Sequence, residues 1–426
     1  MDISVIGAGV VGCATAVGFT IRGHNVHLVE CNPNRISAIR EGVWKSVEPN
    51  LGRHMKSLIE QGQLELSERF DIRCHPEIIF ICVGTPTSPD GHTDSSYMLE
   101  AIKDVVDNYS GTRMPLIAVR STTPPGTISN ILVPYFKKLQ KGTNAEPMHI
   151  ASNPEFLREG SALSDFLNPK RIVIGVDNDE DSQTLRRIYT DFNALIVEVP
   201  ISTAEMIKSS SNAFLATKIS FINEIGILCK HLGIDTYEVA KGLGYDTRIG
   251  SQYLEAGLGF GGSCIPKDLR ALIHLYEESG IASSLLSSVQ EVNKNQIQIL
   301  ENMIVERYGP LKKKQIAILG LSFKPGTDTV IESPVLSLID ILLNQEAIIM
   351  VHDPMAMENA RDILGSRVKY SSTLHEAVQE ADLVIITTGW NEYGNSEIFK
   401  GKHVIDTRRV IKERKIPEGK YEGFLW

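Results

Sequence analysis

The sequence contains few cysteines, no long apolar run and fewer basic than acidic residues. Its 426 residues include six Cys, none of them in a CxxC pair, which excludes a disulfide framework and favours reduced thiols in a cytoplasm. No apolar run approaches the roughly 18–20 residues needed to cross a bilayer, so we expect no membrane partner. With 43 Lys and Arg against 52 Asp and Glu, the net charge of −9 argues against nucleic acid as a partner.

The chain alternates short apolar runs with helical patterns and has no internal repeat of fixed period. Parallel strands covered by helices on both faces have this pattern, which predicts an α/β fold with doubly wound sheets. In residues 1–200 the runs are Ile3–Ile6, Val26–Val29, Ile78–Val83, Leu116–Val119, Ile172–Val176 and Leu195–Val199, and His149–Ser152 is also strand-like. In residues 311–426 they are Ile316–Leu319, Ile348–Val351, Leu383–Thr387 and Val404–Ile405.

Residues 201–310 carry helical patterns without strands. Ile201–Gly233 contains no Pro and has apolar or small residues at intervals of three and four, which predicts one helix of about thirty residues. We therefore expect three domains: an α/β domain at 1–200, a helical central domain at 201–310 and a smaller α/β domain at 311–426.

A GxGxxG motif lies between the first predicted strand and a helical pattern. Gly7 permits a tight turn, Gly9 lets a pyrophosphate approach the backbone, and Gly12 lets helix and strand pack closely. Glu30 follows the next strand, where a carboxylate accepts hydrogen bonds from ribose hydroxyls and repels a 2′-phosphate, which favours NAD over NADP. The alternative is a glycine-rich turn without a ligand. Gly84, Thr85 and Thr122 follow two further strands, at the edge where open α/β sheets bind ligands.

The segment 257–268 has four Gly within six positions and ends in Cys264, Ile265, Pro266, Lys267 and Asp268. A helix start and a nearby Lys both favour the thiolate form of a cysteine. We interpret Cys264 as reactive, whereas Cys13, Cys82 and Cys229 fit the ordinary reading of buried, inert cysteines.

Two pairs of polar residues have a spacing of four. Glu155 and Glu159 would share a face if their segment is helical, and Lys208 and Asn212 could supply two donors to an oxyanion from the long predicted helix. A solvated helix face is the alternative for each pair.

Assembled, these segments resemble the UDP-glucose/GDP-mannose dehydrogenase family nearly end to end. The resemblance rests on GAGVVG at 7–12, VGTP at 83–86, STTPPGT at 121–127, NPEFLREG at 153–160, AEMIKSSSNAF at 204–214, RIG at 248–250, GFGGSCIPKD at 259–268, LGLSFKPGTD at 319–328 and DTRR at 406–409. It implies two Rossmann-like, doubly wound domains joined by a long central helix and a helical middle domain, in a homodimer.

The resemblance also implies a reaction. The family oxidises a sugar C6 alcohol to a carboxylate with NAD, in two hydride transfers without release of the aldehyde. Cys264 would trap the aldehyde as a thiohemiacetal and then carry a thioester, which water hydrolyses. Lys208 and Asn212 would stabilise oxyanions, Asp268 and Thr122 would position or activate water, and Glu155 would assist proton transfers.

Carried onto matching positions, the resemblance gives a full set of expected site residues and no metal. The catalytic residues are Cys264, Lys208, Asn212, Asp268, Glu155 and Thr122. The cofactor-binding residues are Gly7, Gly9, Val10, Val11, Gly12, Glu30, Arg35, Gly84, Thr85, Thr122, Glu159 and Lys267. The substrate-binding residues are Glu155, Phe156, Leu157, Lys208, Asn212, Arg248, Tyr253, Gly261, Phe323, Lys324 and Arg408, of which Arg248 would reach the neighbouring subunit's site.

The features of the UDP-glucose branch predict oxidation of UDP-glucose to UDP-glucuronate. Ser263, Lys267 and Asp268 disfavour N-acetyl sugars, and Arg408 and the segment 165–171 favour UDP-glucose over GDP-mannose. Arg120, in place of a commoner Lys, also occurs in GDP-mannose enzymes, so oxidation of GDP-mannose is one alternative. A two-electron dehydrogenase would leave Cys264 without a role. A catalytically silent nucleotide-sugar-binding regulator is the alternative from a different class.

One departure from the family pattern gives a prediction. The family has Arg immediately before Glu-Ser-Pro, and this chain has Ile331. Because that position usually approaches the cofactor, we expect weaker NAD binding than in relatives, or a compensating cation elsewhere. A crystal structure with NAD bound in an ordinary, tight pyrophosphate and nicotinamide site would contradict this expectation.

Overall fold

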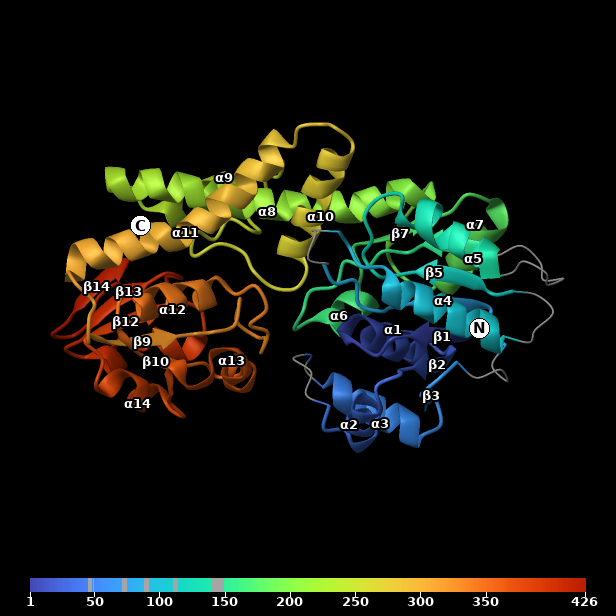
Figure 1. The fold of residues 1–426 in the computed structure, drawn as a ribbon, viewed down its shortest axis with the longest axis horizontal. Helices are drawn as coiled ribbons and strands as arrows, with labels where there is room; N and C mark the ends of the chain where they lie inside the picture. Colours follow the sequence, from blue (N-terminus) through green and yellow to red (C-terminus); the bar gives the residue numbers. More distant parts are fainter. Residues whose placement is uncertain (45–47, 49, 71–74, 88–91, 110–113, 140–148) are drawn as a thin grey trace. The chain divides into compact units, whose positions relative to one another are not determined.

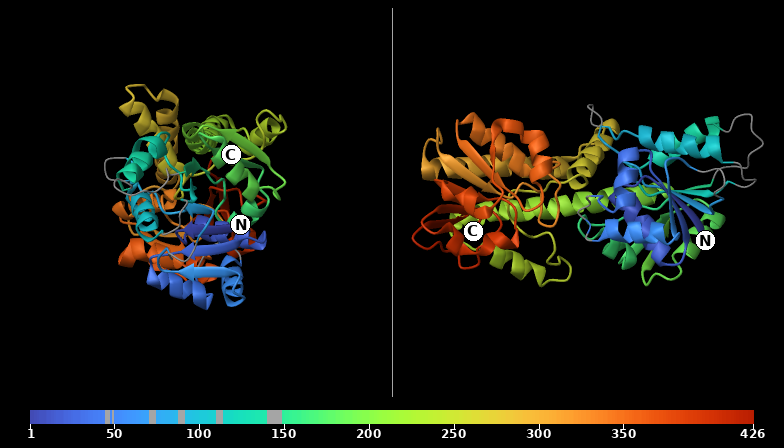
Figure 2. Two further views of the ribbon diagram at one scale, coloured as in Figure 1. Left: turned by 90° about the vertical axis from the view of Figure 1, so that its right-hand side faces the viewer. Right: turned by 90° about the horizontal axis from the view of Figure 1, so that it is seen from below.

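The computed structural model describes residues 1–44, 48, 50–70, 75–87, 92–109, 114–139 and 149–426. The chain forms two compact units, Met1–Ser211 and Asn212–Trp426, each built on its own sheet with helices on both faces (Figure 1; Figure 2). The α/β, doubly wound fold class is thereby confirmed. The bounds of the three expected domains stay a prediction, because the division into two units lies within the helix Ile201–Leu232.

In the described residues the first unit contains an eight-stranded sheet with the order β3-β2-β1-β4-β5-β6-β7-β8. Neighbouring strands pair in parallel except β6 and β7, which meet antiparallel at one residue pair. The strands are β1 Asp2–Ile6, β2 Asn25–Val29, β3 Leu64–Ser67, β4 Ile78–Ile81, β5 Leu116–Val119, β6 His149–Ser152, β7 Arg171–Gly175 and β8 Leu195–Val199. The purely parallel sheet expected from the sequence is therefore wrong at this one junction.

The helices of the first unit cover both faces of this sheet. They are α1 Val10–Ile21, α2 Pro33–Glu41, α3 Leu51–Glu60, α4 Ser96–Asn108, the π-helical turn Ile128–Leu132 with α5 Val133–Leu139, α6 Ala162–Leu167 and α7 Asp179–Ile188. On β4, Ile78 and Phe80 belong to one hydrophobic cluster, and Ile79 and Ile81 belong to the cluster on the opposite face. This alternation with both sides buried explains why the strand is continuously apolar.

The predicted long helix is confirmed as α8, Ile201–Leu232, which runs through the division between the units. The second unit adds α9 Thr236–Gly244, α10 Ile265–Glu278 and α11 Ser284–Tyr308. Among the helices that the structure describes, none is both long enough and apolar enough for a bilayer crossing.

The sheet of the second unit is parallel throughout its described pairs, with the order β11-β10-β9-β12-β13-β14. Its strands are β9 Gln315–Leu319, β10 Ile348–His352, β11 Lys369–Tyr370, β12 Leu383–Ile386, β13 His403–Asp406 and β14 Lys420–Gly423. Its helices are α12 Pro334–Asn344, α13 Met357–Leu364 and α14 Leu374–Gln379, with short 3₁₀ turns at Gly365–Arg367, Asn391–Gly394 and Ser396–Phe399.

Three strands were not expected from the sequence: β3, β11 and β14. Each lies at an edge of its sheet, and each carries polar residues between the apolar ones. Such short, polar edge strands lack the apolar run that identifies a central strand.

A buried carboxylate fixes the loop that follows β5. Glu205 on α8 accepts hydrogen bonds from the Thr123 hydroxyl (2.9 Å) and from the backbone N–H groups of Gly126 (2.7 Å) and Ile128 (3.1 Å). This loop, which includes Thr122, is therefore held against the first turns of the long helix.

We expect Glu205→Gln to lower the free energy of unfolding by about 1–3 kcal/mol at pH 7, because one amide N–H must then face a donor. Burial raises the pKa of the Glu205 carboxyl, against the hydrogen bonds from Ile128, Gly126 and Thr123. The folded chain therefore holds that proton more tightly, so the wild type loses stability as the pH rises from the ordinary pKa to the raised one. The variant cannot ionise, and its deficit should shrink over that range.

Urea denaturation at several pH values measures both effects. The matched control is Glu224→Gln, at an exposed position of the same helix, which should change the free energy of unfolding by less than about 0.5 kcal/mol. A deficit of Glu205→Gln that grew with pH would contradict the assigned direction of the pKa shift.

Candidate active site

The glycine loop after β1 has the geometry of a phosphate cradle. Gly7 has a φ of +100°, and a Cβ there would lie 2.7 Å from the Cys82 carbonyl oxygen. A Cβ on Gly12 would lie 1.8 Å from the Gly7 carbonyl oxygen, whereas one on Gly9 would meet nothing within 4 Å. Gly7 and Gly12 are thus required by packing, and Gly9 leaves open space at the start of α1, which Val10 and Val11 begin. The loop therefore fits a dinucleotide pyrophosphate.

Glu30 is buried directly after β2 and faces this loop. Its carboxylate accepts the N–H of Ala8 (3.0 Å) and of Asn32 (2.9 Å) and a hydrogen bond from Arg35 (3.1 Å), with the Cys31 thiol at 3.8 Å. Arg35 is partly exposed and can turn toward a ligand. The predicted ribose-binding acid is therefore pre-oriented by the glycine loop itself.

The ends of β4 and β5 meet next to this loop. The Ser121 hydroxyl donates to the Val83 carbonyl (2.6 Å), and the Thr85 hydroxyl donates to the Thr122 carbonyl (3.1 Å). A Cβ on Gly84 would meet nothing within 4 Å. Gly84, Thr85 and Thr122 thus share one rim of the sheet.

Glu155 and Lys208 form a buried ion pair in the first unit. The Lys208 Nζ lies 3.1 Å from Glu155 Oε1, and Glu155 Oε2 accepts the N–H of Leu157 at 2.5 Å. Phe156, next to Glu155 in the chain, is half-buried, with the Lys208 Nζ 5.3 Å and the Arg171 guanidinium 4.0 Å from its ring centre. Lys208 is thereby oriented from two sides.

The segment 153–158 is not helical, and α6 begins only at Ala162. The shared helix face considered for Glu155 and Glu159 is therefore wrong: Glu155 is buried and Glu159 is half-buried. Sequence reasoning also missed Glu48, which is buried and accepts the N–H groups of Gly160 (2.6 Å) and Ala162 (2.7 Å), closing the turn after Glu159.

In the second unit, the Asp268 carboxylate contacts two of the predicted site residues, Asn212 and Lys267. Asn212 donates its Nδ2 to Asp268 Oδ2 (2.5 Å), and the Lys267 Nζ lies 2.7 Å from Asp268 Oδ1. Asp268 is buried in the first turn of α10. Asn212 and Lys208, although one turn apart on α8, are thus each oriented by a different carboxylate.

Cys264 is exposed at the N-cap of α10, with the Ser263 hydroxyl 3.6 Å from its Sγ. The loop before it is anchored at three points. The N–H of Gly257 donates to Asn223 (2.8 Å), that of Phe260 to Asn293 (2.7 Å), and that of Gly262 to the Ile331 carbonyl (3.0 Å). Asn223 and Asn293 were not expected from the sequence, because they lie on α8 and α11, far along the chain.

The glycines of this loop are needed by close packing. A Cβ on Gly261 would lie 2.3 Å from the Glu332 carbonyl oxygen, and Gly262 has a φ of +86° and faces the Phe323 ring, 2.8 Å from such a Cβ. A Cβ on Gly257 would lie 2.7 Å from the Arg408 guanidinium. Gly261, Phe323 and Arg408 therefore all line the loop that presents Cys264.

The remaining substrate candidates of the second unit are less closely grouped. Lys324 lies with its Nζ 5.6 Å from the Phe323 ring centre, and Arg408 donates its Nε to the Thr387 carbonyl (3.1 Å), while burial lowers the pKa of its guanidinium. Tyr253 has a φ of +63°. Arg248 is 88% exposed, paired with Asp246 of its own turn, so within this chain it points to solvent.

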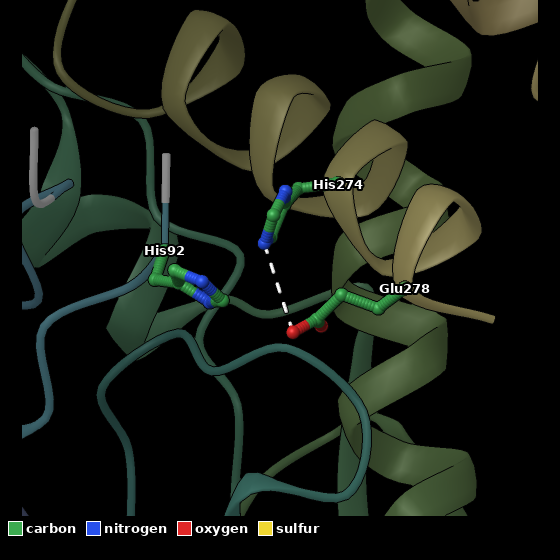
Figure 3. A group of neighbouring side chains, drawn as sticks. All are labelled: His92, His274 and Glu278. Carbon is green, nitrogen blue, oxygen red and sulfur yellow. Dashed lines mark ion pairs between the residues drawn. The ribbon is translucent and has the colours of Figure 1, made fainter. Parts of the chain in front are cut away.

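Figure 3 shows a further pair of side chains on α10, drawn together with His92 of the first unit. The Nε2 of His274 lies 3.7 Å from Glu278 Oε1, four residues along the helix. Pairs with this spacing are common on helix surfaces.

Models of one family match three consecutive parts of the chain. The NAD binding domain of the UDP-glucose/GDP-mannose dehydrogenase family matches residues 1–193, its central domain residues 202–295 and its UDP binding domain residues 317–413. The cofactor is therefore NAD, which the glycine loop and Glu30 fit.

Individual proteins agree. UDP-glucose 6-dehydrogenase YwqF of Bacillus subtilis is 40% identical over 97% of this chain and 93% of its own, and that of Rickettsia felis is 38% identical over 96% and 93%. A solved UDP-glucose dehydrogenase of Pyrobaculum islandicum is 39% identical, with a TM-score of 0.93 over 100% of this chain and 98% of its own. The resemblance identified from the motifs is confirmed: the chain belongs to the UDP-glucose/GDP-mannose dehydrogenase family.

Proposed function

We propose that the protein oxidises UDP-glucose to UDP-glucuronate with two equivalents of NAD, through a covalent adduct on Cys264. The observation that carries this proposal is the exposed Cys264 thiol at the start of α10, on a loop anchored at three points and one helical turn before the buried Asp268. The names of the similar proteins support UDP-glucose as the substrate.

All but one of the residues that would hold NAD lie in the first unit, and the exception is Lys267 on α10. Gly7, Gly9 and Gly12 with the start of α1 fit the pyrophosphate, and Glu30 fits the ribose hydroxyls. The remaining proposed contacts come from Val10, Val11, Arg35, Gly84, Thr85, Thr122, Glu159 and Lys267. When bound, NAD accepts a hydride from C6 of the sugar in each of the two oxidations.

Cys264 makes the second oxidation possible. The first oxidation yields an aldehyde, and addition of the thiol forms a C–S bond and a thiohemiacetal that still has one C–H bond at C6. Loss of hydride from that carbon leaves a thioester, which water cleaves to carboxylate and thiol. In total, one alcohol, one water and two NAD give one carboxylate, two NADH and three protons.

Lys208 and Asn212 would stabilise the oxyanions at C6. Their partners Glu155 and Asp268 hold the ammonium and the amide in defined orientations, so only small movements are required when negative charge develops. Glu155 and Asp268 also offer carboxylate oxygens for proton transfer, with Thr122 as a further group for positioning water.

The second sheet would hold the nucleotide part of the substrate. Phe323 offers an aromatic face, and Lys324 and Arg408 offer cations that suit a diphosphate. The proposed contacts at Phe156, Leu157, Tyr253 and Gly261 would complete the site, with Arg248 entering from a neighbouring subunit.

We also propose a homodimer in the cytoplasm. Phe214, Phe221 and Leu228 follow one another at intervals of seven along α8 and are 64%, 49% and 55% exposed. An apolar stripe on a helix at this period favours packing against another helix. The few cysteines suit a reducing compartment.

Stoichiometry tests the function. We expect two NADH for each UDP-glucose consumed, measured by absorbance against product, and far slower turnover of GDP-mannose and UDP-N-acetyl sugars in the same assay. One NADH per sugar would indicate a two-electron dehydrogenase. No NADH from any nucleotide sugar would favour the silent regulator.

Cys264→Ser should abolish formation of UDP-glucuronate and allow at most slow formation of the aldehyde, because an alkoxide replaces the thiolate poorly. Mass spectrometry of the wild type under turnover should detect the sugar bound to Cys264. The matched control is Cys31→Ser, another exposed cysteine, which should keep the two-to-one stoichiometry. Unchanged acid production by Cys264→Ser would contradict the thioester mechanism.

Phe221→Glu should convert the dimer to monomer in size-exclusion chromatography with light scattering, because it puts a charge into the proposed helix contact. The control is Ile363→Glu on α13, which is 50% exposed against 49% for Phe221 and should leave the mass unchanged. A wild type that is monomeric, or a variant that stays dimeric, would refute this interface.

A further inference from the structure

The two units share a local geometry that is not visible as a sequence repeat. Gly7 directly follows β1, has a φ of +100° and donates its N–H to the Val29 carbonyl of β2 at 2.8 Å. Gly320 directly follows β9, has a φ of +105° and donates its N–H to the His352 carbonyl of β10, also at 2.8 Å. The turns after β1 and β9 therefore share their glycine conformation and their hydrogen bond to the neighbouring strand.

An acid follows the second strand in both cases. Glu30 comes directly after β2 and accepts the N–H of Ala8 at 3.0 Å, and Asp353 comes directly after β10 and accepts the N–H of Leu321 at 2.7 Å. Asp353 thus occupies in the second sheet the place that Glu30 occupies in the first.

The two carboxylates differ in how many donors they already hold. Asp353 Oδ2 accepts the N–H of Leu321 (2.7 Å), the N–H and hydroxyl of Ser322 (both 3.1 Å) and the Trp390 indole N–H (3.1 Å). Its Oδ1 accepts the N–H groups of Met355 and Ala356 (both 2.8 Å). These six donors exceed the roughly four lone-pair positions of a carboxylate.

Glu30, by contrast, holds three nitrogen donors, one of them from the partly exposed Arg35, and a weak thiol contact. Asp353 is buried and has no capacity left for a ribose hydroxyl. In addition, Phe323 and Lys324 follow where the first unit has Val10 and Val11 of a helix, and α12 begins only at Pro334. The second sheet therefore cannot bind a nucleotide in the way that the first does.

We infer that Asp353 is a positioning residue for the nucleotide-sugar site, and that it acts through the segment 321–323 without touching the ligand. Its charge joins that segment to the end of β10 and, through Trp390, to the segment after β12. This inference rests on the proposed function, in which Phe323 and Lys324 bind the UDP part of the substrate.

The segment that Asp353 holds also packs against the loop that carries Cys264. Phe323 continues directly from the two residues that Asp353 holds, and its ring packs against Gly262, two residues before Cys264. A shift of the segment 321–323 would therefore move the nucleotide-binding side chains and loosen the packing of the cysteine loop. The buried Asp353 carboxylate therefore positions both the nucleotide-binding side chains and the packing of the cysteine loop.

Asp353→Asn in the full-length enzyme tests the inference. An amide presents two N–H groups where the carboxylate has only acceptors, so at least two of the six donors lose their partner. We expect KM for UDP-glucose to rise about tenfold or more, with KM for NAD within about twofold of the wild type and a smaller change in kcat. Equal rises in both KM values, or no rise, would overturn the proposal.

Two further variants keep the test decisive if Asp353→Asn does not fold. Trp390→Phe removes one donor and keeps the carboxylate, and it should raise KM for UDP-glucose by about two- to fivefold with KM for NAD unchanged. Glu30→Gln is the reciprocal control and should raise KM for NAD with KM for UDP-glucose unchanged. A Trp390→Phe enzyme with wild-type KM for UDP-glucose would count against the proposal.

Calorimetric titration with UDP separates this inference from the proposed function. A wild type that binds neither UDP nor UDP-glucose would refute the proposed function. A wild type that binds UDP, together with an Asp353→Asn variant that binds it equally well, would refute only the role of Asp353.

Discussion

The structure depends on one recurring constraint: a buried carboxylate must be surrounded by donors, and here the donors belong to the segments that form the site. Glu30 holds the glycine loop, Glu205 the loop after β5, Glu155 the Lys208 ammonium, Asp268 the Asn212 amide, and Asp353 the segment after β9. An unsatisfied buried charge is costly, so each acid makes its segment adopt one position. Rigid placement of loops thus follows from the requirement to satisfy charges, and no regular secondary structure is needed in the loops themselves.

The need to surround buried carboxylates with donors also orients the groups proposed for catalysis. A donor that already faces a carboxylate has lost its rotational freedom before the substrate binds, so stabilising an oxyanion needs only small movements. Lys208 is shared between Glu155 and the face of Phe156, and Asn212 is tied to Asp268, which Lys267 also contacts. A network of this kind is sensitive to the loss of any member, because removing one partner leaves another buried polar group unpaired. The proposed catalytic roles are therefore roles of the pairs Lys208–Glu155 and Asn212–Asp268, and no single residue performs them alone.

Most regular elements, the cofactor loop and the acids Glu30, Glu155 and Asp268 could be predicted from the sequence, whereas Glu205 and Asp353, which also hold loops, could not. The α8 helix and the strands with apolar runs follow from periodicity, and Gly7, Gly9 and Gly12 follow from local steric needs. Glu205 and Asp353 have no such signature, because their partners are mostly backbone N–H groups, and every residue except Pro has one. The edge strands β3, β11 and β14 could not be predicted either, because their sequences are too polar to identify a strand without its neighbour.

The cysteine loop is anchored next to Ile331, the position where this chain departs from the family pattern. Gly262 is held by the backbone carbonyl of Ile331, and Gly261 packs against the backbone of Glu332, so neither contact uses the side chain at position 331. The Ile331 side chain is exposed. These anchors of the loop that presents Cys264 are therefore made without the side chain at position 331. Any effect of having Ile331 in place of Arg therefore comes from the loss of a positive charge that could face a ligand. It does not come from a change in the position of the Cys264 thiol.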